Sequence, residues 1–215
     1  MTTHVFTFCE TELTALPSGG LWIAADQTLI VSDLHLCKSE RFARKGRALL
    51  PPYETRDTLT RLDQDLTDLA PARVICLGDS FDDVEAIEHM GDAEKLWLAR
   101  MQAGREWIWI AGNHDAGPVE LGGEYVAETR VGNLTFRHIA EETTVAGEIS
   151  GHYHPKHAIT GAPRPCFVYD DRRLIMPAYG TYTGGIPATK DPIRPLFDDR
   201  AFAIVTGRQC LAVPV

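Results

Sequence analysis

A series of short apolar runs, each followed at once by aspartate, asparagine or histidine, constrains this chain more than any other feature. The segments that follow the runs are Ser32-Asp33-Leu34-His35, Gly78-Asp79, Gly112-Asn113-His114-Asp115, Arg137-His138 and Gly151-His152-Tyr153-His154. Short runs rich in Val, Ile, Phe and Trp predict strands. In α/β folds the loops at the carboxyl ends of buried strands usually hold the active site. We therefore expect these polar side chains to meet at one edge of a sheet.

The rest of the chain predicts an α/β fold. Strands are expected at residues 5–8, 21–24, 28–31, 74–77, 107–111, 134–136, 166–169, 174–176, 202–205 and 211–213. Leucines 59, 62, 66 and 69 recur at helical spacing after two prolines and predict a helix with one apolar face. A second helix is expected from about Val84 to Ala103, capped by Asp82 or Asp83 and ended by Gly104. We expect residues 1–215 to form one domain with a β-rich second half.

Composition excludes several classes of protein. The 215 residues are 44% hydrophobic and carry a formal charge of −9, so a globally basic nucleic-acid-binding surface is excluded. Nothing in the sequence predicts a membrane span or a secretory signal. The five cysteines are widely spaced and lack a CxxC pair, which favours reduced thiols in a cytoplasmic protein. Positive charge for an anionic substrate would then come from a local patch or from bound metal.

The residues after the strands have the chemistry of metal ligands. Carboxylate, imidazole and amide donors together suit Mn, Fe or Zn better than calcium. Seven donors are too many for one ion but suit two ions that share a carboxylate, namely Asp33, His35, Asp79, Asn113, His138, His152 and His154. Paired ions of this kind usually hydrolyse phosphate esters. On an extended backbone, the alternate residues of Asp33-x-His35 and of His152-x-His154 would point the same way.

The ordered motifs resemble the calcineurin-like metallophosphoesterases. They are Asp33-x-His35, Gly78-Asp79-x-x-Asp82, Gly112-Asn113-His114-Asp115, His138 and Gly151-His152-x-His154. Longer stretches resemble one bacterial branch, the ligase-associated DNA-damage-response metallophosphoesterases. These stretches include Leu50-Pro51-Pro52-Tyr53, Trp107–Asp115, Phe136-Arg137-His138, Met176-Pro177-Ala178-Tyr179-Gly180 and Gly184-Gly185. The resemblance implies a four-layer α-β-β-α sandwich of two mixed sheets flanked by helices.

The resemblance also implies a role for each site residue. The first metal would take Asp33, His35, Asp79 and His154, and the second would take Asp79, Asn113, His138 and His152. Asp79 would bridge the two ions, which are most often manganese in this branch. A metal-bridging hydroxide would attack phosphorus, while His114 faces the leaving group and Asp115 orients its ring. Asp82 would position the Asp79 loop.

The implied activity is that of a manganese-dependent DNA endonuclease or phosphodiesterase in DNA repair, working with a DNA ligase, a helicase and a nuclease. Single-stranded or looped DNA is the expected substrate. Basic residues crowd the segment from Lys38 to Arg47, so Arg44 and Lys45 are candidates to contact phosphates, with Arg137, and Tyr153 is a candidate to stack on a base. Two alternatives stay open: a phosphoesterase of a small nucleotide or cyclic nucleotide, and a non-catalytic scaffold on the same fold.

Overall fold

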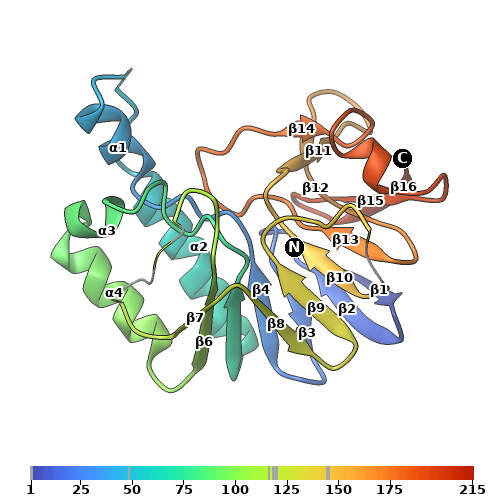
Figure 1. Ribbon diagram of the computed structural model, residues 1–215, viewed down its shortest axis with the longest axis horizontal. Helices are drawn as coiled ribbons and strands as arrows, with labels where there is room; N and C mark the ends of the chain where they lie inside the picture. Colours follow the sequence, from blue (N-terminus) through green and yellow to red (C-terminus); the bar gives the residue numbers. More distant parts are fainter. Residues whose placement is uncertain (1, 48, 116, 118–120, 144–145) are drawn as a thin grey trace.

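Two mixed β-sheets pack face to face in the computed structural model, which describes residues 2–47, 49–115, 117, 121–143 and 146–215 (Figure 1). The strands of the first sheet lie side by side in chain order. They are β1 (His4–Phe8), β2 (Thr11–Ala15), β3 (Leu21–Ile23), β4 (Thr28–Val31), β5 (Arg73–Cys76), β6 (Glu106–Ile110) and β7 (Glu124–Val126). Strands β1 to β4 are antiparallel, whereas β4 to β7 run parallel.

The second sheet follows the order β14-β11-β12-β13-β10-β9-β8, and β15 and β16 extend it from β12. Its strands are β8 (Glu128–Val131), β9 (Leu134–Arg137), β10 (Glu148–Ser150), β11 (Pro155–His157), β12 (Arg164–Tyr169), β13 (Arg173–Ile175), β14 (Ile186–Pro187), β15 (Phe202–Val205) and β16 (Leu211–Pro214). Strands β9, β10 and β13 are parallel neighbours. Their carboxyl ends therefore lie at one edge of this sheet.

Helices cover the outer face of the first sheet (Figure 1). They are α1 (Lys38–Arg44), α2 (Glu54–Leu69), α3 (Ala86–His89) and α4 (Asp92–Gln102). The predicted leucine helix is confirmed as α2, because Leu59, Leu62 and Leu66 are buried in one cluster with Leu29 and Val74 of the sheet. The three leucines pack on leucine and valine side chains of the sheet. This packing removes apolar surface from water and so stabilises the helical layer on the first sheet.

A second cluster fills the space between the sheets. Ile30, Ile75 and Ile108 of the first sheet pack there with Phe136 and Phe167 of the second. The outer face of the second sheet is covered by the 3₁₀ turn η1 (Arg194–Leu196) and by loop residues such as Ile193 and Phe197. The predicted α/β sandwich of two mixed sheets is thus confirmed, with a thinner layer over the second sheet than over the first.

The predicted second helix was wrong in its start and its continuity. Met90 and Gly91 have extended backbones and separate α3 from α4, and Gly91 is the N-cap of α4. Asp82 and Asp83 cap neither helix, because their carboxylates accept hydrogen bonds from arginines of α1. The expected strands also omitted β2, β7, β8, β11 and β14, in which most side chains are partly buried or exposed.

The parallel pairing of the central strands decides where the polar motifs go. Val31, Cys76 and Trp109 lie opposite one another in β4, β5 and β6, so the loops after these strands begin side by side. The loops after β9 and β10 begin at the corresponding edge of the other sheet. Among the described residues, no helix has the length and apolar character needed to cross a bilayer.

Replacing the fully buried Leu62 by alanine removes apolar contacts from the interface of α2 with the sheet. We expect Leu62→Ala to lower the free energy of unfolding by about 2–5 kcal/mol, as urea denaturation would measure. Leu96→Ala is the matched control, because Leu96 is 72% exposed on α4. A loss as large in the control would contradict the packing described for α2.

Candidate metal centre

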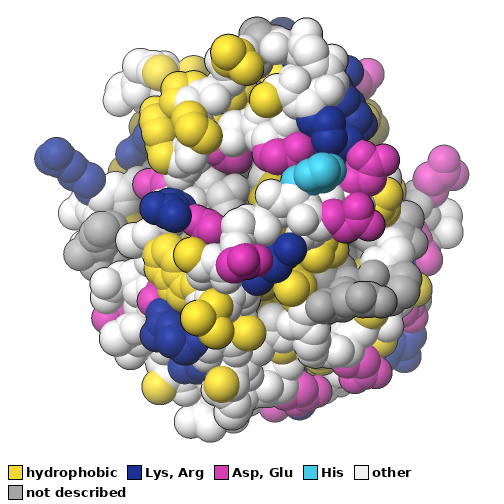
Figure 2. Space-filling view, turned by 90° about the vertical axis from the view of Figure 1, so that its left-hand side faces the viewer, with side chains coloured by type: hydrophobic (Ala, Val, Ile, Leu, Met, Phe, Trp, Pro, Cys, Tyr) yellow, Lys and Arg dark blue, Asp and Glu magenta, His cyan; other side chains and the backbone are white. Residues whose placement is uncertain are grey.

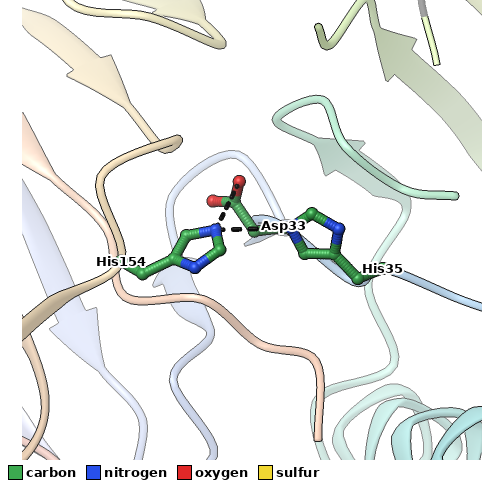
Figure 3. Close-up of side chains that lie close together, drawn as sticks. All are labelled: Asp33, His35 and His154. Carbon is green, nitrogen blue, oxygen red and sulfur yellow. Dashed lines mark hydrogen bonds and ion pairs between the residues drawn. The ribbon is translucent and has the colours of Figure 1, made fainter. Parts of the chain in front are cut away.

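The strand-end loops of both sheets bring the predicted ligands together in two neighbouring groups. Asp33, His35 and His154 place donor atoms within 4.8 Å of one another, and so do Asp79, His138 and His152. Figure 3 shows the first group, in which the rings of His35 and His154 flank the carboxylate of Asp33. Each group combines residues from loops after the first and the second sheet.

The first group lies where the loop after β4 meets the loop after β10. Nε2 of His154 is 3.2 Å from Oδ1 of Asp33 and 3.4 Å from Nε2 of His35. Asp33 is fully buried, and its carboxylate also accepts hydrogen bonds from the backbone N–H of His152 and from the Ser32 hydroxyl at 2.5 Å. These donors fix the Asp33 carboxylate so that one oxygen faces the histidines.

The second group lies where the loops after β5, β9 and β10 meet, and Asn113 joins it from the loop after β6. Nε2 of His138 is 2.9 Å from Oδ1 of Asn113 and 3.3 Å from Nδ1 of His152. The other nitrogen of His138 faces the carbonyl of Leu77 at 2.8 Å. A carbonyl only accepts, so Nδ1 of His138 carries a proton, and Nε2 is the nitrogen that would coordinate a metal.

Asp79 lies between the two groups. Its Oδ2 is 3.4 Å from Nε2 of His138 and 3.9 Å from Nε2 of His35, one imidazole from each group. Its Oδ1 accepts a hydrogen bond of 2.8 Å from the backbone N–H of His114. This is the position that the shared carboxylate of a two-metal site requires.

Asp82 and Asp115 have different contacts from those predicted. Oδ1 of Asp82 is 3.0 Å from Nδ1 of His35, so Asp82 orients a ligand ring, whereas it was expected to position the Asp79 loop. Asp115 was expected to orient the ring of His114, and this prediction is wrong. Nδ1 of His114 instead lies 2.9 Å from the carbonyl of Asp82, and His114 forms a third group of donor atoms within 4.8 Å of one another, with His35 and Asp82.

Asp115 is a positioning residue for the Asp79 loop. Its carboxylate accepts hydrogen bonds from the backbone N–H groups of Asp79, Ser80, Phe81 and Gly112, at 2.7 to 3.1 Å. Because the side chain is only 3% exposed, these amides have little access to water. Four backbone N–H groups of the loops after β5 and β6 therefore share one buried carboxylate as their acceptor.

The ligand backbones are left-handed, which corrects the extended geometry expected for the Asp-x-His and His-x-His motifs. Five of the predicted ligands have positive φ, namely Asp33 (52°), His35 (44°), Asp79 (46°), His152 (71°) and His154 (47°). Residues with a Cβ adopt this region at a cost of order 1–3 kcal/mol each. Such strain collects at functional sites, where the surrounding structure imposes it.

Glycine permits the close approach of strand ends at two ligands. A Cβ on Gly78 would lie 2.5 Å from Nδ1 of His138, and one on Gly151 would lie 2.6 Å from Oδ2 of Asp33 and closer still to the Ser32 hydroxyl. The missing side chains therefore leave room for ligand side chains from the opposite sheet.

The charges and lone pairs of these groups fit divalent cations. Burial opposes the ionisation of Asp33, but His154, His138 and Ser32 outweigh burial and lower the pKa of that carboxyl. Burial and the neighbouring His138 lower the pKa of His152, which favours its neutral ring. Imidazole nitrogens that face each other at 3.3–3.4 Å need a proton or a metal between or beside them.

The basic segment on α1 is largely neutralised by carboxylates. Arg44 donates two hydrogen bonds to Asp83, at 2.8 and 2.9 Å, and Lys45 lies 3.1 Å from the same carboxylate. Arg41 pairs with Asp82 at 2.8 Å. Figure 2 shows the helical side of the molecule, where basic and acidic side chains lie next to one another. The proposed contact of Arg44 and Lys45 with substrate stays a prediction.

Arg137 and Tyr153 lie closer to the second ligand group. Arg137 pairs with Glu128 at 2.7 Å and also with Glu141, and it lines an open cavity of about 340 Å³ together with Asn113 and His138. The Tyr153 ring packs edge-on against His152, with ring centroids 5.0 Å apart. Both residues thus adjoin the ligands, and their contact with substrate stays a prediction.

Comparison with known proteins agrees with this geometry. Residues 27–175, which include every predicted ligand, match the family model described as calcineurin-like phosphoesterase. Among solved structures, the chain is similar to the crystal structure of Pseudomonas putida nuclease MPE, with a TM-score of 0.76 and 24% sequence identity over 99% of this chain and 100% of that one. That similarity shows a shared fold. A search of curated proteins finds no match.

Removing the Asp82 carboxylate leaves the His35 ring without its orienting partner. We expect Asp82→Ala to weaken metal binding about 10–100-fold, measured by calorimetric titration of the metal-stripped protein with Mn²⁺. Asp83→Ala is the matched control, because Asp83 contacts α1 and not a ligand ring. Equal losses in the two variants would show that Asp82 acts only by holding α1.

Proposed function

The chain belongs to the calcineurin-like phosphoesterase family and is a metal-dependent phosphoesterase, and we propose that it is a dinuclear phosphodiesterase that cleaves DNA. The position of Asp79 carries the dinuclear part of the proposal, since its Oδ2 lies between His35 of one group and His138 of the other. Asp33 and His154 would complete the first metal site with His35 and Asp79. Asn113 and His152 would complete the second.

When bound, two divalent ions lower the pKa of a coordinated water and neutralise the charge that builds on the phosphate oxygens. The chain itself orients the ligands: Asp82 and the Leu77 carbonyl fix the rings of His35 and His138. Asp115 fixes the loop that carries Asp79. The ligand geometry is therefore set by protein hydrogen bonds, which is what preorganised electrostatic catalysis requires.

His114 is proposed to act at the leaving group. Its Nδ1 faces the carbonyl of Asp82, so that nitrogen carries a proton in either charge state, and Nε2 remains to hold and transfer a second one. The His114 ring lies edge-on to the ring of His35, with centroids 5.1 Å apart. His114 is thus beside the first ligand group, where it could protonate a departing oxygen.

A nucleic-acid substrate is supported by the similar fold of a nuclease and by the chemistry of the site. Two dications against the carboxylates of Asp33 and Asp79 leave the site positive within a chain of net charge −9. Manganese is proposed as the native metal, and iron or zinc would accept the same donors. A role in DNA repair beside a ligase, a helicase and a nuclease, on single-stranded or looped DNA, rests on the branch resemblance alone.

Hydrolysis of a small nucleotide or cyclic nucleotide is the second candidate, and one observation favours it. The ion pairs of Arg44, Lys45 and Arg137 neutralise the cations that were expected to contact a DNA backbone. A panel of single-stranded DNA, duplex DNA, mononucleotides and cyclic nucleotides, each assayed with manganese, separates the two. Preference for the small substrates would overturn the DNA assignment while leaving the phosphodiesterase intact.

Asp79→Ala removes the shared ligand, and we expect it to abolish manganese-dependent cleavage of single-stranded DNA in a gel assay. His114→Ala should lower kcat by roughly 10²–10⁴-fold while Mn²⁺ still binds, since the ring is expected to act on the leaving group and not on the metal. The control is His89→Ala, because His89 is exposed on α3, outside the ligand groups. Full activity in Asp79→Ala or in His114→Ala would refute the role given to that residue.

A further inference from the structure

The segment from Met176 to Gly185, together with Ile186, forms hydrogen bonds with the backbone of the two loops that carry the first ligand group. The backbone N–H of Tyr179 donates to the Ser32 carbonyl at 2.8 Å, and that of Gly180 donates to the Asp33 carbonyl at 3.0 Å. The N–H of Ile186, just after the segment, donates to the His154 carbonyl at 3.2 Å. In Figure 1 the orange segment between β13 and β14 crosses from the second sheet towards α2. The segment from Met176 to Gly185 therefore lies against the backbone of Asp33 and ends next to the backbone contact with His154.

The same segment, with Gly180 and Thr181, lines a polar cavity of about 250 Å³ at the junction of α2 and the second sheet. Its charged lining residues are Arg61 and Asp57 of α2 and Lys156 of β11. Hydroxyl groups of Ser18, Thr181, Thr183 and Thr206 complete its polar lining. Two cations and one carboxylate line the cavity, and a second carboxylate, that of Asp65, lies behind the lining, where it accepts hydrogen bonds from the hydroxyls of Ser18 and Tyr179.

Arg61 is held in place by several contacts. Its Nη2 donates to the Thr181 hydroxyl at 3.0 Å and lies 3.6 Å from Asp57. Its guanidinium stacks on the Tyr179 ring, 5.0 Å from the centroid. These contacts use only part of the donor capacity of a guanidinium, which has five N–H groups in a fixed fork.

Lys156 supplies the unneutralised charge. Within the described part of the chain, the ammonium group has no carboxylate partner within ion-pair distance. A Cβ on Gly185 would lie 2.6 Å from Cε of Lys156, so the glycine leaves the path for this side chain. The hydroxyls of Thr183 and Thr206 already donate to backbone carbonyls. The free N–H donors of the cavity therefore come from its two cations.

We propose that this cavity binds a phosphate group, and that in the working enzyme the phosphate belongs to the nucleic-acid strand next to the cleaved bond. The strand assignment rests on the proposed function, whereas the phosphate site does not. A guanidinium fork and an ammonium on one polar cavity match the oxygens of a phosphate. Gly180 lines the cavity, and its backbone N–H donates to the Asp33 carbonyl, so a strand bound at the metals would have to cross this segment to place another of its phosphates in the cavity.

The test measures binding without catalysis. A labelled single-stranded oligonucleotide is titrated with the full chain in EDTA and followed by fluorescence anisotropy, and inorganic phosphate is titrated by calorimetry. Lys156→Glu should weaken binding of the oligonucleotide at least tenfold, and Lys156→Gln, which only removes the charge, should weaken it less. Lys95→Glu is the matched control, because Lys95 is half-buried on α4 and does not line the cavity, and it should leave both affinities within twofold.

The outcomes separate the two parts of the proposal. Equal losses in the Lys156 and Lys95 variants would mean that only net charge matters, which overturns the site. Phosphate binding that depends on Lys156, without any effect on the oligonucleotide, overturns the strand assignment and leaves a site for free phosphate. If the wild-type chain cleaves no phosphodiester yet binds phosphate through Lys156, the proposed function fails and the phosphate site stands.

Discussion

The carboxylate of Asp115 is the interaction on which the metal centre depends. It gathers backbone amides from the loop after β5 and from the loop after β6, and so fixes their spacing. Asp79 can lie between the two ligand groups only because its own N–H and those of Ser80 and Phe81 are held there. Loss of the Asp115 carboxylate would leave the four backbone N–H groups that it binds without an acceptor, and so would disturb the position of Asp79 although Asp115 is not itself a predicted ligand.

The candidate ligands and their place at strand ends could be predicted, because both follow from local pattern: apolar runs predict β4, β5, β6 and β9, and the polar residues come next. The sequence did not reveal the partners of Asp82 and Asp115, which depend on how separate loops fold over each other. The left-handed ligands were hidden for the same reason, since neighbouring sheets impose them. The edge strands lacked apolar runs, and Gly91 broke a helix whose pattern continued through it.

A segment of this protein that is basic in the sequence is largely neutralised by carboxylates in the fold. The segment from Lys38 to Arg47 is basic in the sequence, yet the acidic residues after Asp79 fold against it and neutralise much of it. The role of Lys156 could not be predicted from the sequence, because a single lysine in a short strand belongs to no motif or basic run. The three-dimensional arrangement therefore decides which cations are available to an anion, and composition does not.

The left-handed turns at the ligands bear on how the protein takes up metal. The left-handed region is unfavourable for a residue with a side chain, so the hydrogen bonds and packing of the surrounding loops stabilise it here. Loops held in this way would present their donors to an ion in set directions, so metal binding would need little movement of the backbone. A site of this kind selects by radius and donor type. Ions of similar size would exchange in it with little rearrangement, so the metal found after purification would reflect supply as well as preference.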